Sequence, residues 1–262
     1  MNIAMIRIFD NVGYYETRFI LMIFALAAAL FFLAKKKDRN YLVMFISGAV
    51  WQSVMSLVVM NMTLRGQEYS LLLFGFQVPS VLIWLIQGVF EGGIHGLMGY
   101  WFLDVYINRG SDQKQGWMPY MSALIFVLVM SLAVGFLNQG QSITSVRPMF
   151  KPGPILAMFY VTFITLVIAG LKGGAIFRLL CVYFIGTLIY SLVNLEPLHP
   201  LGVRYIGYGI PGGEVQAMPP IRQIFIMLYS HLWEIAGSRL HYFVIPYVLG
   251  LLAFKQISTE KS

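Results

Sequence analysis

Charged residues are scarce in this chain. Only 11% of its 262 residues are Asp, Glu, Lys or Arg, whereas 58% are hydrophobic. A soluble domain carries about 25% charged residues, because its surface must face water. The composition therefore excludes an ordinary soluble domain and predicts a protein that lies in lipid.

Cysteine and dense basic blocks are lacking too. The one cysteine, Cys181, cannot form an internal disulfide or a CxxC site. The formal net charge is +7, but the densest basic cluster, residues 35–39, directly follows a hydrophobic run. Such a cluster is typical of a cytoplasmic flank, since Lys and Arg resist translocation. We therefore expect no nucleic-acid partner.

The sequence also shows no cleavable signal peptide, and its apolar and polar residues do not alternate with a period of two. The first full apolar run begins after Arg18 and is followed by lysines, so we expect it to remain as a span. The apolar runs are continuous, which disfavours a β-barrel and favours helices of about 20 residues. The predicted spans are 18–34, 40–62, 76–106, 118–137, 155–171, 175–195 and 222–254.

The predicted fold is an all-α integral membrane bundle of about seven transmembrane helices, in one polytopic domain over residues 1–262. The segment 196–220 before the last helix is rich in Gly and Pro, which opposes a helix. Its tyrosines and isoleucines favour an ordered extracytoplasmic cap or a re-entrant piece. With the N-terminus outside, the loops and span ends on the cytoplasmic side hold more Lys and Arg than those on the outer side. We expect a multi-pass protein of the plasma (inner) membrane, with a cytoplasmic C-terminus.

Two of the predicted spans carry charges where apolar residues are expected. An ionisable group at membrane depth costs roughly 2.5–3.5 kcal/mol and is a functional-site hypothesis. In 76–106, Gln87, Glu91 and His95 recur every four residues and share one helical face. The glycines around them allow a close helix approach or leave room for a ligand.

The last span carries the second group. His231, Glu234, Ser238 and Tyr242 follow a spacing of three or four residues on one face, and Arg239 flanks it. Both helices run in the same direction, so Glu91 and Glu234 are expected at similar depth. The candidate catalytic residues are Glu91, His95, His231 and Glu234. The candidate substrate-binding residues are Gln87, Ser238, Arg239 and Tyr242.

Three chemistries fit these residues. The glutamates are candidate proton donors or acceptors, with the histidines as partners. A metal at Glu91, His95, His231 and Glu234 is a weaker alternative, because neither HExxH nor HxxxH is present. The third alternative is an ion pair between Arg239 and one glutamate that only holds two helices together. We expect no cofactor.

The function that these patterns favour is an enzyme acting on a lipid or isoprenoid substrate by general acid–base chemistry. The expected partners are the bilayer and a hydrophobic small molecule or lipid. A proton-coupled transporter or ligand sensor would use the same residues as a relay. An accessory subunit would pair these charges with another membrane chain.

Overall fold

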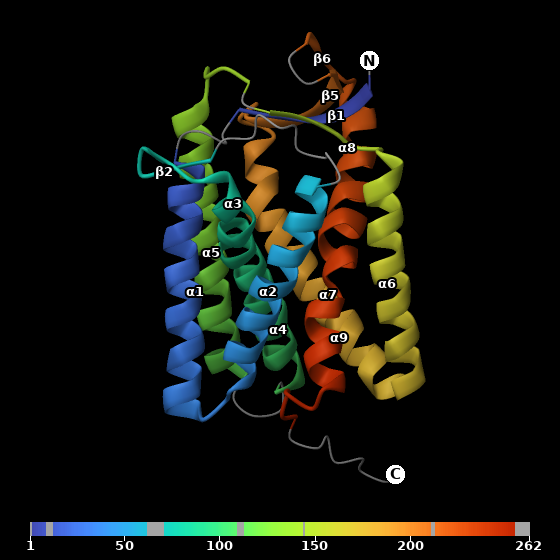
Figure 1. Cartoon of the computed structure of the whole chain (residues 1–262). Coiled ribbons are helices and arrows are strands. Elements are labelled where there is room, and N and C mark those ends of the chain that lie inside the picture. Colours follow the sequence, from blue (N-terminus) through green and yellow to red (C-terminus); the bar gives the residue numbers. More distant parts are fainter. Residues whose placement is uncertain are drawn as a thin grey trace.

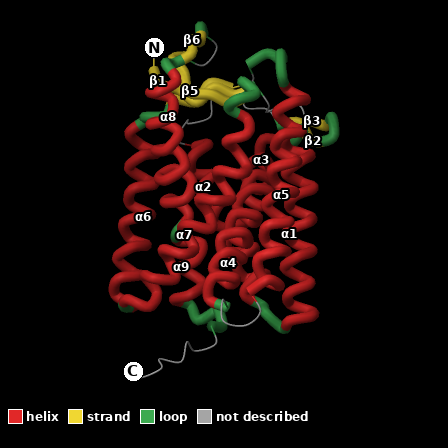
Figure 2. Tube along the Cα trace, turned by 180° about the vertical axis from the view of Figure 1, so that it is seen from behind, coloured by secondary structure: helices red, strands yellow, loops and turns green. Residues whose placement is uncertain are grey.

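The computed structural model describes residues 2–8, 13–61, 71–108, 113–143, 145–210 and 213–254. These residues form an upright helical bundle with a small sheet at one end (Figure 1). The N-terminal strand lies at the sheet end, and the last helix ends at the opposite end (Figures 1 and 2).

Six helices of the described chain are long and apolar enough to cross a membrane, which confirms a multi-pass helical architecture. Each ends within a few residues of a predicted span, because the runs of apolar residues set the helix lengths. The third is continuous through α3, a π-helical turn η1 and α4. The helices are α1 (Tyr14–Lys36), α2 (Asn40–Asn61), α3–η1–α4 (Ser80–Gln87, Gly88–Gly92, Gly93–Ile107), α5 (Gln113–Asn138), α6 (Pro152–Lys172) and α7 (Gly174–Leu195).

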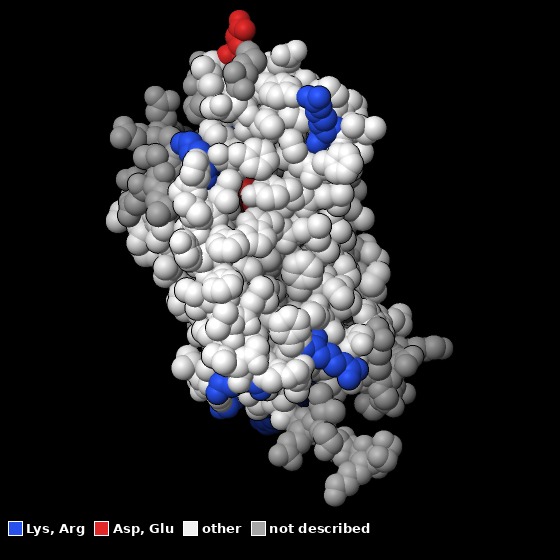
Figure 3. Space-filling model, turned by 90° about the vertical axis from the view of Figure 1, so that its right-hand side faces the viewer, with Lys and Arg blue, Asp and Glu red and all other residues white. Residues whose placement is uncertain are grey.

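Large apolar side chains are exposed on these helices, as expected of a surface that faces lipid chains. Seen from the side of α6, the molecule has a broad, almost uncharged belt with Lys and Arg at both rims (Figure 3). A small group of acidic atoms shows within that belt, nearer the sheet end (Figure 3).

A further helical stretch runs alongside the bundle and changes its winding along its length. It comprises α8 (Pro220–Tyr229), the π-helical η3 (Ser230–Ala236), the 3-10 turn η4 (Gly237–Arg239) and α9 (His241–Val248). Figure 1 shows it passing from the sheet end to the opposite end.

The sheet was not expected from the helical patterns. It has four antiparallel strands in the order β4-β1-β5-β6 and covers one end of the bundle (Figure 2). Its strands are β1 (Asn2–Arg7), β4 (Ser145–Pro148), β5 (Arg204–Gly209) and β6 (Val215–Ala217). The Gly/Pro-rich segment thus contributes two strands, together with the 3-10 turn η2 (Glu196–Leu198). The short hairpin of β2 (Leu72–Leu73) and β3 (Phe76–Gln77) lies at the same end of the bundle and contacts α1.

Glycines bring α2 into backbone contact with the third span. A Cβ atom on Gly92 would lie 2.2 Å from the Gly48 carbonyl oxygen, and one on Gly96 would lie 2.3 Å from the Met44 oxygen. Any larger residue at either position would force these helices apart. The glycines beside Glu91 therefore serve helix approach, one of the two roles expected for them.

The half of the bundle away from the sheet has an aromatic and aliphatic core. Phe32 stacks on Tyr41 with ring centroids 3.8 Å apart, and Trp101 packs edge-on against Phe32. Tyr183 stacks on Phe243 in the same cluster. Packed aromatic rings fill this half, whereas buried polar side chains gather in the half under the sheet.

Candidate functional site

A cavity of about 160 Å³ lies between the bundle and the underside of the sheet. Its walls come from α1, α2, η1, α4, α6, α7, η3, η4, α9, and strands β1, β4 and β5. Six of the eight candidate residues line it: Glu91, His95, Glu234, Ser238, Arg239 and Tyr242. The two glutamates, from helices far apart in sequence, therefore face one cavity.

The third span and the last helical stretch contact each other through α4 and α9. Helices α2 and α7 each contact both of them. No contact between η1 and η3, the turns that carry the two glutamates, is among the main element contacts of the described residues. The two glutamates therefore reach the cavity from separate turns.

Both glutamates lie on π-helical turns. Glu91 is in η1 and Glu234 is in η3. A π-turn uses i→i+5 hydrogen bonds, so it contains an extra residue relative to an α-helix, and such turns occur frequently at functional sites. The carbonyl of Glu91 accepts a hydrogen bond from His95 Nδ1 at 2.7 Å, and that of Glu234 accepts one from Ser238 Oγ at 2.5 Å. Side chains one turn later thus stabilise both distorted turns.

This hydrogen bond also defines the tautomer of His95. A carbonyl oxygen only accepts, so Nδ1 must carry the proton and Nε2 of the neutral ring must be an acceptor. The side chain is 4% exposed, and Nε2 has no hydrogen-bond partner among the described residues. The ring is held edge-on against Tyr190, with centroids 4.6 Å apart. His95 therefore lines the cavity, and its Nε2 is a buried hydrogen-bond acceptor.

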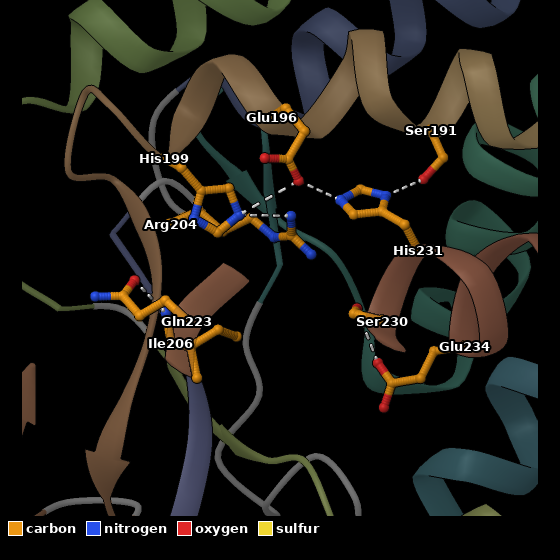
Figure 4. Close-up of polar contacts among 9 residues, drawn as sticks. All are labelled: Ser191, Glu196, His199, Arg204, Ile206, Gln223, Ser230, His231 and Glu234. Carbon is orange, nitrogen blue, oxygen red and sulfur yellow. Dashed lines mark hydrogen bonds and ion pairs between the residues drawn. The ribbon is translucent and has the colours of Figure 1, made fainter. Parts of the chain in front are cut away.

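Glu234 forms an ion pair with Arg147 of β4, 2.7 Å away, and accepts a hydrogen bond from Ser230 Oγ at 3.1 Å (Figure 4). The predicted alternative was an ion pair between Arg239 and a glutamate. Among the ion pairs of the described residues, the partner of Glu234 is Arg147 and not Arg239. Glu91 accepts a longer hydrogen bond, 3.4 Å, from the Tyr14 hydroxyl.

Gln87 and His231 do not line the cavity. Gln87 donates to the Tyr15 hydroxyl of α1 at 3.1 Å. His231 is 1% exposed and bridges Ser191, at 2.5 Å from Nδ1, to the carboxylate of Glu196 (Figure 4). The expected stripes assumed uniform α-helical spacing. A π-turn inserts a residue, so side chains spaced by three or four residues across it no longer share one face.

The metal alternative is not supported by the placement of these residues. No group of three or more His, Cys, Asp or Glu side chains in the described part of the chain is close enough to hold a metal ion. His95 turns Nδ1 to a backbone carbonyl, and His231 is occupied by Ser191 and Glu196. The residues that the spacing predicted as metal ligands therefore lie at two separate sites.

Arginines form the part of the site that sequence reasoning missed. The five that line the cavity are Arg7, Arg18, Arg147, Arg204 and Arg239, against two glutamates. Only Arg239 stood out in the sequence, because the other four lie at helix ends or between apolar runs. Arginine is normal in such places, so no local signal marks them. Strand pairing and the return of β1 over the bundle bring them together.

The electrostatics of the cap reflect this crowding. Burial lowers the pKa of Arg204 to about 10, and the positive charges of Arg7 and Arg147 contribute to the decrease. Burial, followed by the charge of Arg204, lowers the pKa of His199 to about 3. His199 is therefore neutral at pH 7, and its Nε2 accepts a hydrogen bond from Arg204 at 3.1 Å (Figure 4).

No protein-family model, curated protein or solved structure matches this chain. The function is accordingly argued from the chemistry of the cavity.

Proposed function

We propose that this protein is a plasma-membrane enzyme that acts on a lipid or isoprenoid substrate by general acid–base chemistry. The observation that carries the proposal is that Glu91, His95 and Glu234 line one cavity inside an apolar bundle. A general acid or base must lie within hydrogen-bond reach of the proton that it transfers. A single cavity gives three such groups access to one substrate.

The three groups have different environments and hence different roles in this proposal. His95 accepts a proton at Nε2, because Nδ1 is held by the Glu91 carbonyl. The carboxyl group of Glu91 accepts a long hydrogen bond from Tyr14, so in this proposal it is the second proton-transfer group. Glu234 is held by Arg147 and Ser230, so it positions charge at the site.

The apolar part of the cavity wall suits a substrate from the bilayer. Met55 and Val58 of α2 line it on one side, and Ala157 and Met158 of α6 line it on another. Ligand sites are generally lined by apolar side chains with a few placed polar groups. A lipid or isoprenoid meets both requirements.

We further propose a seventh crossing and an orientation. The helical stretch 220–248 is interrupted by η3 and η4, but its length of about 29 residues at about 1.5 Å each exceeds a hydrocarbon core of about 30 Å. The lysines at the end of α1 favour the cytoplasm for the end away from the sheet. The sheet and N-terminus are then outside, and the C-terminus is cytoplasmic.

The test is to purify the full chain in mild detergent and identify bound lipid by mass spectrometry, before and after incubation with membrane lipid extracts. Conversion of a lipid or isoprenoid that is lost in Glu91→Gln and His95→Gln supports the enzyme. Glu214→Gln changes an exposed carboxylate on the cap and is the matched control. Unchanged lipid composition with the wild type, together with a stoichiometric membrane partner, would support the accessory-subunit alternative.

A proton-coupled transporter is the second candidate, because a hydrogen-bonded chain enters the bundle from the cap. Glu196, whose side chain is 31% exposed, contacts the buried His231, which contacts Ser191. Proton uptake coupled to solute flux in liposomes, abolished by His231→Gln, would favour this function over the enzyme.

A further inference from the structure

The four-stranded sheet covers the cavity at one end. Strands β1, β4 and β5 all contribute side chains to the cavity wall. Met5 of β1 and Ile206 of β5 are fully buried, and they form one apolar cluster with Met149 and Met218. Such a cluster is packed as densely as a protein interior, so this part of the sheet does not admit a solute from water.

The last helical stretch closes the opposite end. Helix α9 contacts α2, α6 and α7, and η4 contacts α6. The Trp51 ring of α2 packs edge-on against His241 of α9, with centroids 5.4 Å apart. On the other flank, Thr162 of α6 donates a hydrogen bond to the Gly237 carbonyl of η4 at 3.4 Å. Away from the sheet, α9 is therefore packed against α2 on one side and α6 on the other.

The side between α2 and α6 is packed differently in the half near the sheet. Both helices line the cavity, but no contact between them is among the main element contacts of the described residues. In those same contacts the partners of α8 are η3 and β5, and no residue of α8 is buried. Aromatic rings join η3 to α6, where Phe159 lies 6.2 Å from Trp233. The gap in the packing therefore lies beside α2.

The surface of the molecule agrees with an opening on this side. Acidic atoms show at the surface within the almost uncharged belt, nearer the sheet end (Figure 3). Glu91 and Glu234 are the acidic residues that line the cavity, and both are half-buried. Met55 of α2 and Ala157 of α6, which line it as well, are also half-buried.

The depth of the gap assigns it to one leaflet. Met55 lies six residues before Asn61, the end of α2, and Ala157 lies five residues after Pro152, the start of α6. At about 1.5 Å per residue these positions are about 9 Å and about 7.5 Å from the helix ends, whereas half of the hydrocarbon core is about 15 Å. Both therefore lie at the depth of the leaflet on the sheet side.

We propose that the gap between α2 on one side and α6 with α8 on the other is a side entrance for a lipid of the sheet-side leaflet. The polar end of the lipid lies in the cavity, and its hydrocarbon chain remains in the bilayer. The chain would pack on apolar side chains that are exposed around the gap, among them Leu57 of α2 and Leu156 of α6. The inference deepens the proposed function, on which it rests for the reaction but not for the entrance.

The size of the cavity agrees with this division of the ligand. Its volume of about 160 Å³ is below the roughly 300–1,000 Å³ of pockets that enclose a whole drug-sized ligand. A lipid of greater volume can place only its polar end there.

The experiment measures whether lipid chains reach the cavity wall. The full chain with Cys181→Ser is labelled with bimane at Met55→Cys and placed in nanodiscs of phosphatidylcholine that carries a doxyl group near the head-group end of its chain. The matched control is bimane at Val54→Cys, which is next along α2, is 42% exposed and does not line the cavity. We expect the doxyl lipid to quench both labels to a similar degree, and iodide in the aqueous phase to quench neither.

Blocking variants test the position of the entrance. Ala157→Trp adds a large ring to the opposite wall and should lower the lipid quenching at position 55 at least about threefold, with no change at position 54. Met158→Trp adds a ring on the same wall and replaces Ala157→Trp if that variant does not accumulate. Moving the doxyl group to the methyl end of the chain should weaken quenching at position 55, because the gap is closer to the head groups.

Three outcomes would overturn the entrance. They are a label at position 55 that the lipid does not quench, quenching by iodide in place of lipid, and quenching that neither tryptophan variant lowers. The proposed acid–base function fails separately. If position 55 is quenched as expected and the wild type converts no lipid, the chemistry is wrong and the entrance stands. If lipid is converted while position 55 is not quenched, the function stands and the substrate enters by another route.

Discussion

Arg7 of β1 and Arg204 of β5 are cross-strand partners in the sheet that covers the bundle. Arg204 is 3% exposed, so little water screens its charge. Both side chains line the cavity. The charge of Arg7 contributes to the lowered pKa of Arg204, so the two like charges repel each other across the strands.

The first prediction concerns this pair. Arg204→Met keeps the apolar stem but removes the charge, and should raise the unfolding temperature of the ligand-free protein by about 1–3 °C. Thermal unfolding in detergent followed by tryptophan fluorescence measures the shift. Arg222→Met, an exposed position at the same end, should cause no shift. A lower unfolding temperature in Arg204→Met would mean that the contact with His199 outweighs the repulsion.

The second prediction concerns pH. His199 faces Arg204, Glu196 and His231, and its pKa is lowered from 6.5 to about 3. The unfolded chain binds a proton at His199 more readily than the folded protein does. Protonation of the unfolded chain therefore lowers the free energy of unfolding as the pH falls from 6.5 toward 3, and above pH 6.5 this loss is absent. Between pH 6.5 and 5 the loss is about 2 kcal/mol.

Chemical unfolding of the wild type and His199→Gln at several pH values tests this. The variant should show a shallower loss of unfolding free energy over that interval, because Gln does not titrate. Identical pH dependence in the two proteins would contradict the assignment.

The third prediction concerns the contact between α2 and the third span. Gly92→Ala should destabilise the protein by about 1–3 kcal/mol or prevent its accumulation, because the added Cβ atom would meet the Gly48 oxygen at 2.2 Å. Gly170→Ala, where nothing lies within 4 Å, should be neutral or stabilising by up to about 1 kcal/mol. Unfolding free energies of the two variants give the comparison, and equal effects would show that the close approach is not required.

The fourth prediction concerns the ion pair of Glu234 with Arg147. A double-mutant cycle with Glu234→Gln and Arg147→Gln should give a coupling energy of about 1–3 kcal/mol, because the side chains are only 9% and 24% exposed. Unfolding free energies of the wild type, both single variants and the double variant supply the cycle. Additive effects would place the two groups apart in solution.

The main features of the bundle were predictable from the sequence. Runs of about 20 apolar residues satisfy backbone hydrogen bonds within one helix and match the thickness of the bilayer, so their ends follow from composition. Glu91 and Glu234 were recognisable as site candidates, because charge inside such a run is costly. Ser238 and Tyr242 followed from their spacing with Glu234, and Arg239 from its place beside that face.

The sheet and the π-turns were not predictable in the same way. A π-turn depends on what packs around a helix, and here His95 and Ser238 bond the carbonyls that it displaces. Those turns removed Gln87 and His231 from the cavity. The strands of the cap pair over long sequence separations, so no local pattern places Arg7 beside Arg204.

The sequence by itself therefore determined that this protein is a multi-pass helical membrane protein with ionisable groups among its apolar runs, because helix formation in lipid is a local requirement. Only the tertiary structure decided that Glu91 and Glu234 share a cavity and that five arginines surround it. Side chains from helices and strands far apart in the chain meet only when the bundle and its sheet assemble.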